Sequence, residues 1–193
     1  MPEYQHDRSL GEGVYFTSDD YIGIMRRIII FMVDVTVLIL LQALITIVHD
    51  LLTGDYVSET PIWIWLFCVW GYLTVVRASR IRTVGYWVTN SKIVNLRGNK
   101  PSVFRMTYRL LLSTFMSFNY IYDLMWSAVD EDRQTLTDRF AGTCVVKKNS
   151  APQGRSEIHL ANYCALGFIY VYQRVTRPKQ FDQKMSSKEN ESV

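Results

Sequence analysis

"IMRRIIIFMVDVTVLILL", residues 24–41, is an apolar run of membrane-helix length with an aspartate inside it. The 21 residues from 28 to 48 carry one charge, Asp34, and Arg26 and Arg27 come just before them. A helix of ~20 residues is long enough to cross ~30 Å of hydrocarbon. An ionised side chain at the centre of such a helix costs about 2.5–3.5 kcal/mol on insertion scales. We therefore expect another part of the chain to supply a partner for Asp34.

Two further apolar runs follow in the chain of 193 residues. Residues 62–76 carry no charge and include three tryptophans, whereas residues 110–122 are interrupted by Ser113, Ser117 and Asn119. Polar residues in an apolar run are typical of a broken helix, so the third run either crosses once or turns back near Asn119. We predict an all-α membrane protein with two transmembrane helices, a third crossing or re-entrant hairpin segment, and a small cytoplasmic connector containing strands.

The charges are distributed unevenly between the runs, although the net charge is only +3. Residues 49–60 contain three acidic residues and no Lys or Arg. The connector has no Asp or Glu and eight basic residues: Arg77, Arg80, Arg82, Lys92, Arg97, Lys100, Arg105 and Arg109. Short basic loops stay in the cytoplasm. The pattern predicts a multi-pass membrane protein with a cytoplasmic N-terminus, and it explains the basic connector without nucleic acid.

Composition divides the chain into four parts. We expect a polar N-terminal leader over 1–20, a membrane domain over 21–148, an aromatic membrane-interfacial segment over 149–177 and a disordered charged tail over 178–193. Within the connector, residues 83–97 predict short strands around a turn at 89–91. Pro101 and Ser102 predict the start of a helix, and the residues around Gly142 predict another strand.

The partner of Asp34 should come from outside its own helix. Arg27 lies two turns before Asp34 on the same face, about 10.5 Å away along the axis, so direct pairing would stretch both side chains. The candidates are the polar residues of the third apolar run and four charged residues: Arg105, Arg109, Asp138 and Arg139. Two roles remain open for Asp34, a proton or cation site and a structural ion pair.

The residues that catalysis or metal binding would need are scattered. Three histidines and three cysteines are dispersed, and no HExxH, GxSxG, P-loop or CxxC pattern occurs. We expect no enzymatic activity, no metal site and no cofactor.

Three motifs together resemble the RDD family of small bacterial membrane proteins. They are Arg27 with Asp34, the connector "RTVGYWVTNSKIVNLRGNKPSVFRMTYR" and the later stretch "RQTLTDRFAGTCVV". The family is named for one arginine and two aspartates, and the resemblance assigns these to Arg27, Asp34 and Asp138. The connector departs from the family's usual Gly-Lys-Arg pattern because it has Gly85-Tyr86-Trp87, and residues 156–177 lie outside the shared region.

The resemblance implies ion or small-solute transport, with Asp34 as an intramembrane charged site. The alternative is a non-catalytic membrane scaffold or accessory subunit of a larger membrane complex, in which the charges fix helix packing. In either case the expected partners are the lipid bilayer and a homo-oligomer or larger complex.

Overall fold

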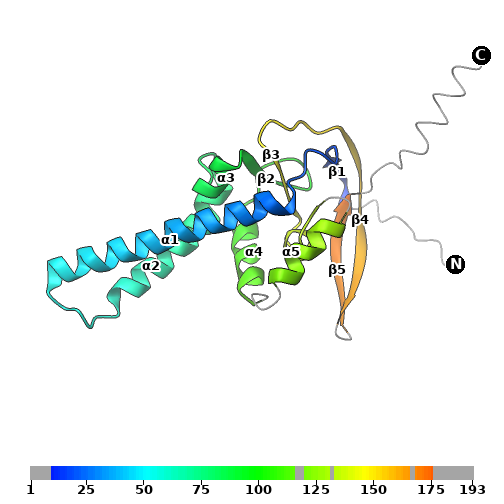
Figure 1. Cartoon of the computed structure of the whole chain (residues 1–193). Helices are drawn as coiled ribbons and strands as arrows, with labels where there is room; N and C mark the ends of the chain where they lie inside the picture. Colours follow the sequence, from blue (N-terminus) through cyan, green and yellow to red (C-terminus); the bar gives the residue numbers. More distant parts are fainter. Residues whose placement is uncertain (1–9, 116–119, 131–132, 166–167, 176–193) are drawn as a thin grey trace, which may run out of the picture.

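The structure is a computed structural model that describes residues 10–115, 120–130, 133–165 and 168–175 (Figure 1). The helices are α1 (Ile24–Thr53), α2 (Thr60–Trp70), the π-helical segment η2 (Gly71–Val76), α3 (Val84–Val88), α4 (Val103–Phe115), α5 (Tyr120–Val129) and α6 (Leu136–Phe140). The strands are β1 (Glu12–Tyr15), β2 (Ser91–Asn95), β3 (Thr143–Lys147), β4 (Gly154–Ala165) and β5 (Phe168–Val175).

A long helical hairpin extends away from the rest of the protein (Figure 1). Its first arm, α1, has 30 residues and ends at Gly54, whose left-handed φ of 69° lets its N–H bond to the carbonyl of Asp50. The second arm is α2 continued by η2. Side chains along both arms are exposed and apolar, for example Leu44 (57%) and Phe67 (71%). Such a surface is unsuited to water and suited to lipid.

The predicted all-α fold is wrong. The described residues include two antiparallel sheets, of order β1-β4-β5 and β2-β3. Among them, α1 is the one helix long and apolar enough to cross a membrane, and 17% of its most apolar stretch is buried. The second predicted transmembrane helix is the apolar helix Thr60–Val76, which is shorter. The apolar runs do not reveal these sheets, because β1 pairs with β4 and β2 pairs with β3, and the partners are distant in the sequence.

The segment predicted to lie at the membrane interface contains a β-hairpin. Strands β4 and β5 pair in register from Ile158–Val175 to Ala165–Phe168. Strand β1, within the predicted leader, pairs with β4 and completes the sheet. The predicted tail over 178–193 lies outside the described residues.

The small sheet, β2–β3, lies between the helical hairpin and the larger sheet (Figure 1). Its contact with the larger sheet includes the hydrogen bond from the N–H of Val14 on β1 to the carbonyl of Leu96, just after β2. The strand predicted near Gly142 is β3, and it pairs with β2 from Ser91–Lys147 to Asn95–Thr143. Just before α1, Tyr21 bridges to Val146. The predicted strand over the first part of 83–97 is wrong, because Val84–Val88 forms the short helix α3.

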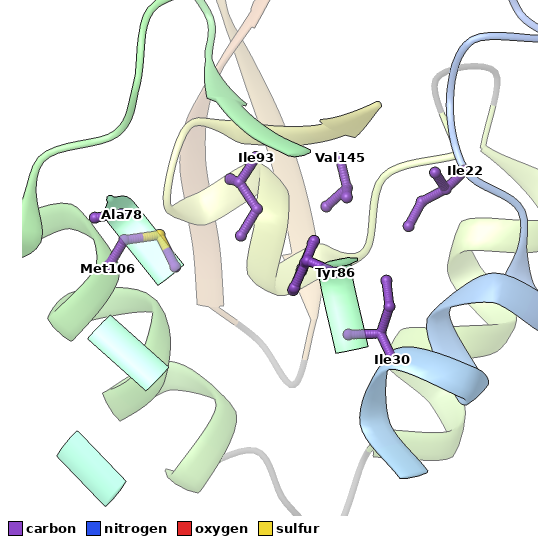
Figure 2. Packing of buried hydrophobic residues seen from close by; sticks show 7 residues of the cluster. All are labelled: Ile22, Ile30, Ala78, Tyr86, Ile93, Met106 and Val145. Atoms are coloured by element: carbon purple, nitrogen blue, oxygen red, sulfur yellow. The ribbon is translucent and has the colours of Figure 1, made fainter. Parts of the chain in front are cut away.

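The core lies where the base of the hairpin meets the small sheet. Figure 2 shows Ile30 of α1 facing Tyr86 of α3, with Ile93 and Val145 contributed by the two strands and Met106 by α4. Met106 is 1% exposed and Val145 is fully buried. This core therefore fixes the first turns of α1 against elements far away in the sequence.

Helices α4 and α5 both pack against α6. Helix α4 begins after Ser102, whose hydroxyl accepts the N–H of Arg105, as Pro101 and Ser102 predict. Near this end Arg105 donates to the carbonyl of Gly142, while Asp130, just after α5, pairs with Arg139 of α6. The start of α4 and the end of α5 thus both contact α6 or the residues just after it, which favours the hairpin over a single crossing. The proposed turn near Asn119 lies outside the described residues.

Candidate functional site

Asp34 lies on α1 and is 3% exposed, although it stands inside an apolar helix. Its Oδ2 accepts hydrogen bonds from Arg77 Nη2 at 2.9 Å and from Thr83 Oγ1 at 2.8 Å. Its Oδ1 accepts from the hydroxyl of Tyr72 at 3.0 Å and from the N–H of Gly85 at 2.9 Å. A carboxylate has about four acceptor positions, so all of them are occupied.

The local backbone explains how α3 reaches this carboxylate. Thr83 is extended and precedes α3, so the N–H of Gly85 in the first turn is free to donate to Asp34. A Cβ at Gly85 would come within 2.5 Å of the carbonyl oxygen of Ile30 and 2.8 Å of Asp34 Oδ1. Only glycine allows this close approach of α3 to α1.

The prediction that Asp34 meets a polar or basic group from outside its own helix is confirmed. The ion pair is made by Arg77, just after η2. The predicted charged partners are therefore wrong in the described residues: Arg105, Arg109, Asp138 and Arg139. Arg77 also lies over the ring of Tyr86, 5.3 Å from its centroid. Arg77 was missed because the connector has eight basic residues, and their charge alone does not indicate which one pairs with Asp34. Its place directly after the second apolar run was the available signal.

Asp138 forms a second charged cluster and is fully buried. Arg27 Nη1 lies 2.7 Å from Asp138 Oδ2, and Arg109 Nη2 lies 2.6 Å from Oδ1. Asp138 also completes a capping box with Thr135 at the start of α6. Burial alone would raise the pKa of Asp138, but Arg109 and Arg27 outweigh it and hold that pKa below its ordinary value.

The three residues that the sequence singles out therefore do not form one triad. Arg27 pairs with Asp138 and ties α1 to α6, whereas Asp34 pairs with Arg77 and ties α1 to the end of the second arm. Arg139 pairs with Asp130 and donates to the hydroxyl of Tyr172 on β5. Each charged group holds elements together that are distant in sequence.

A cavity of about 490 Å³ lies between the two clusters. Its wall is made by residues of α1, η2, α3, α4, α5 and α6, together with Arg77 and Thr135. Arg27, Asp34, Arg77 and Arg109 all line it. The volume falls in the range of sites for small molecules.

Three arginines on this wall keep buried donors that have no hydrogen-bond partner among the described residues. These donors are Arg27 Nε, Arg77 Nε and Arg109 Nη1. Buried donors are nearly always paired in proteins, so a cluster of unpaired ones at a cavity calls for an explanation. No cluster of three or more His, Cys, Asp or Glu residues that could hold a metal ion occurs in the described part of the chain.

The RDD family model matches residues 21–142, which include both apolar arms, the connector, Arg27, Asp34 and Asp138. The chain belongs to the RDD family. The match ends just after α6, so the residues that build the β4–β5 hairpin of this RDD protein lie beyond it. Comparisons with curated proteins and with solved structures find no match.

Proposed function

We propose that this RDD-family protein is a multi-pass protein of the bacterial inner membrane that binds a small solute in the cavity and transports it. The observation that carries the proposal is the cavity itself, because the family's Arg27 and Asp34 line it and Asp138 holds two of its arginines. No catalytic step is part of the proposed function.

The dimensions of the hairpin support membrane insertion with Asp34 near one edge. Residues 35–53 of α1 number 19 and would span ~28 Å, while the 17 residues of Thr60–Val76 would span ~25 Å. Both lengths are close to the ~30 Å hydrocarbon core. The pair of Asp34 with Arg77 then marks the cytoplasmic edge of the bilayer, so the cost of placing a carboxylate at its centre does not arise.

Orientation follows from the charges. The 77–109 connector has eight basic residues and the 49–60 loop has none, which favours a cytoplasmic connector and N-terminus. Cysteines introduced at Asp55 and at Asn99 test this with an impermeant thiol reagent on intact cells, with the unsubstituted protein as background. Labelling at Asp55 and protection at Asn99 are expected, and the reverse pattern would overturn the orientation.

Transport is tested with purified protein in proteoliposomes. The solutes are H⁺, Na⁺, K⁺, inorganic phosphate and octyl phosphate, each compared with empty vesicles. The matched variants are Leu110→Trp, which fills the cavity, and Leu111→Trp, whose side chain is 51% exposed on the same helix. We expect flux of at least one solute that Leu110→Trp abolishes and Leu111→Trp preserves. Flux equal to that of empty vesicles for all five would refute transport.

A membrane scaffold is the second candidate. The observation that favours it is the saturation of Asp34 by four donors, which leaves this carboxylate no open position for an ion. A scaffold would retain its fold and assembly in Leu110→Trp and show no flux in the unsubstituted protein.

A further inference from the structure

The arginines that line the cavity keep donors that are unpaired among the described residues, whereas its best-placed carboxylate, Asp34, has no open acceptor position. The acceptor positions of Asp34 are filled, and Asp138 lies fully buried between Arg27 and Arg109. A cation would have to displace existing bonds at either aspartate. By contrast, Arg27 and Arg109 are 8% and 9% exposed, and each keeps an unpaired N–H group. Such preorganised guanidinium donors suit a phosphate or carboxylate group.

The remaining carboxyl group on the wall does not reverse this preference. Asp123 of α5 accepts the N–H and the hydroxyl of Thr137 at 3.1 and 2.9 Å. Burial raises the pKa of Asp123 above its ordinary value, although the N–H of Thr137 opposes the shift. The three arginines on the wall outnumber its two carboxyl groups, Asp34 and Asp123.

Most of the remaining wall is apolar, although the hydroxyl groups of Ser113, Thr135 and Thr137 also belong to residues that line it. On α1 the lining runs from Arg27 through Ile30 and Asp34 to Leu38, a distance of ~16 Å along the helix. Beyond Asp34 the lining side chains of both arms are hydrocarbon, as in Leu38 and Leu73. The cavity therefore has a cationic end towards the start of α1 and an apolar end towards the membrane hairpin.

Size and access fit a ligand larger than a hydrated ion. The cavity volume of about 490 Å³ equals the liquid volume of about sixteen water molecules. Phe31 lines the cavity and is also 45% exposed, so the wall reaches the protein surface on α1.

We infer that the solute is an amphipathic anion, with a phosphate or carboxylate group bound by Arg27, Arg77 and Arg109 and an acyl or alkyl chain packed along Leu38, Leu73 and Leu110. The inference rests on the proposed function for the location of the solute. The anion can come from a bilayer lipid or from a soluble amphiphile, since both carry the same group and chain.

The test measures binding rather than flux. The full chain in neutral detergent is titrated with octyl phosphate, and dissociation constants are obtained by equilibrium dialysis with the unfolding midpoint as a second readout. The comparators are octyltrimethylammonium, which has the same chain and the opposite charge, and inorganic phosphate, which lacks the chain. We expect octyl phosphate to bind at least about tenfold more tightly than either, because charge-assisted hydrogen bonds and chain burial each contribute that much.

Three variants locate the site. Arg109→Lys keeps the charge that Asp138 needs but removes the extra guanidinium donors, so we expect about tenfold weaker binding of octyl phosphate with little change in the unfolding midpoint. Leu110→Trp should weaken it at least as much, while Leu111→Trp should leave it unchanged. Equal binding of the alkyl cation, or an unchanged dissociation constant in Leu110→Trp, would overturn the inference.

The source of the anion is separated in lipid nanodiscs. Weaker binding of octyl phosphate in phosphatidylglycerol than in phosphatidylcholine discs would show competition by an anionic lipid, and equal binding would indicate a soluble amphiphile. Both results support an amphipathic anion. If octyl phosphate binds selectively but no solute crosses the vesicles, transport fails and the inference stands. If Na⁺ or K⁺ crosses while octyl phosphate does not bind, the inference fails and transport stands.

Discussion

The two buried aspartates of the family motif are stabilised in different ways. Asp34 receives one guanidinium and three uncharged donors, and Arg77, its charged partner, has a side chain that is 18% exposed. Asp138 lies between two buried arginines, from α1 and from α4. Asp34 is therefore a hydrogen-bonded carboxylate with one accessible partner, whereas Asp138 is the only compensating anion in contact with both arginines among the described residues.

This difference suggests a division of roles. Asp138 neutralises the arginines that shape the cationic end of the cavity, and Asp34 fixes the second arm and α3 against α1. Neither aspartate has to bind the solute directly for the site to depend on both.

The largest effect is expected for Asp138→Asn. The variant leaves Arg27 and Arg109 buried without an anion, which should lower the free energy of unfolding by about 3–5 kcal/mol. Urea unfolding in detergent, or the folded yield where the loss is too large to titrate, measures it. The exposed Asp19→Asn is the control and should behave as the unsubstituted protein. A loss below about 1 kcal/mol would mean that Asp138 is not the anion these arginines need.

The difference in unfolding free energy between the unsubstituted protein and Asp138→Asn should depend on pH. The pKa of Asp138 is lowered in the folded state, so its stabilising contribution is fully present above the ordinary aspartate pKa of about 3.9 and is lost as pH falls through the lower folded value. The stability gap between the unsubstituted protein and Asp138→Asn should stay constant from pH 7 to 5 and narrow below about pH 4. Unfolding curves at each pH measure the gap, and a gap that widens on acidification would contradict the ion pairs.

A smaller loss is expected for Asp34→Asn. The ion pair is removed, but Arg77 can turn towards solvent, and the amide oxygen still accepts from Thr83 or Gly85. We expect about 1.5–3 kcal/mol in the free energy of unfolding, measured in the same detergent. The control is Asp55→Asn in the exposed loop between the two arms. A loss as large as that of Asp138→Asn would remove the distinction between the two aspartates.

Gly85→Ala tests whether the close approach of α3 to α1 at Asp34 is required for stability. The added methyl group collides with the backbone of α1 and with Asp34 Oδ1, which should cost about 1–3 kcal/mol. Gly71→Ala is the matched control, because a Cβ there meets nothing within 4 Å and alanine favours helix. Thermal unfolding should shift down for the first variant and not down for the second. Equal shifts would show that the close approach at Gly85 is not required.

Part of this architecture could be predicted from the sequence. The apolar run of α1, the helix start at Pro101 and Ser102, and the strand after Gly142 depend on local patterns. The family motif also identified Arg27, Asp34 and Asp138, which the structure distributes over two clusters.

The rest depends on tertiary contacts. Residues 84–88 are β-branched and aromatic apart from Gly85, yet they form α3, and the N–H of Gly85 in its first turn donates to Asp34. This tertiary hydrogen bond is not visible in the local pattern. The aromatic stretch of β4 and β5 pairs into a hairpin that buries Ile158 and Tyr172, a pairing that its sequence pattern did not predict. The choice of Arg77 over the other connector arginines depends on the folded hairpin, and the one hint in the sequence is its place directly after the second apolar run.

The central claim is that Asp34 locks α1 to the end of the second arm, beside the cavity, through Arg77. A double-mutant cycle with Asp34→Asn and Arg77→Gln tests it directly, with unfolding free energies measured for all four proteins in one detergent. If the lock exists, the double variant is more stable than the sum of the single losses implies, by about 0.5–3 kcal/mol. Losses that simply add, to within about 0.3 kcal/mol, would contradict the claim.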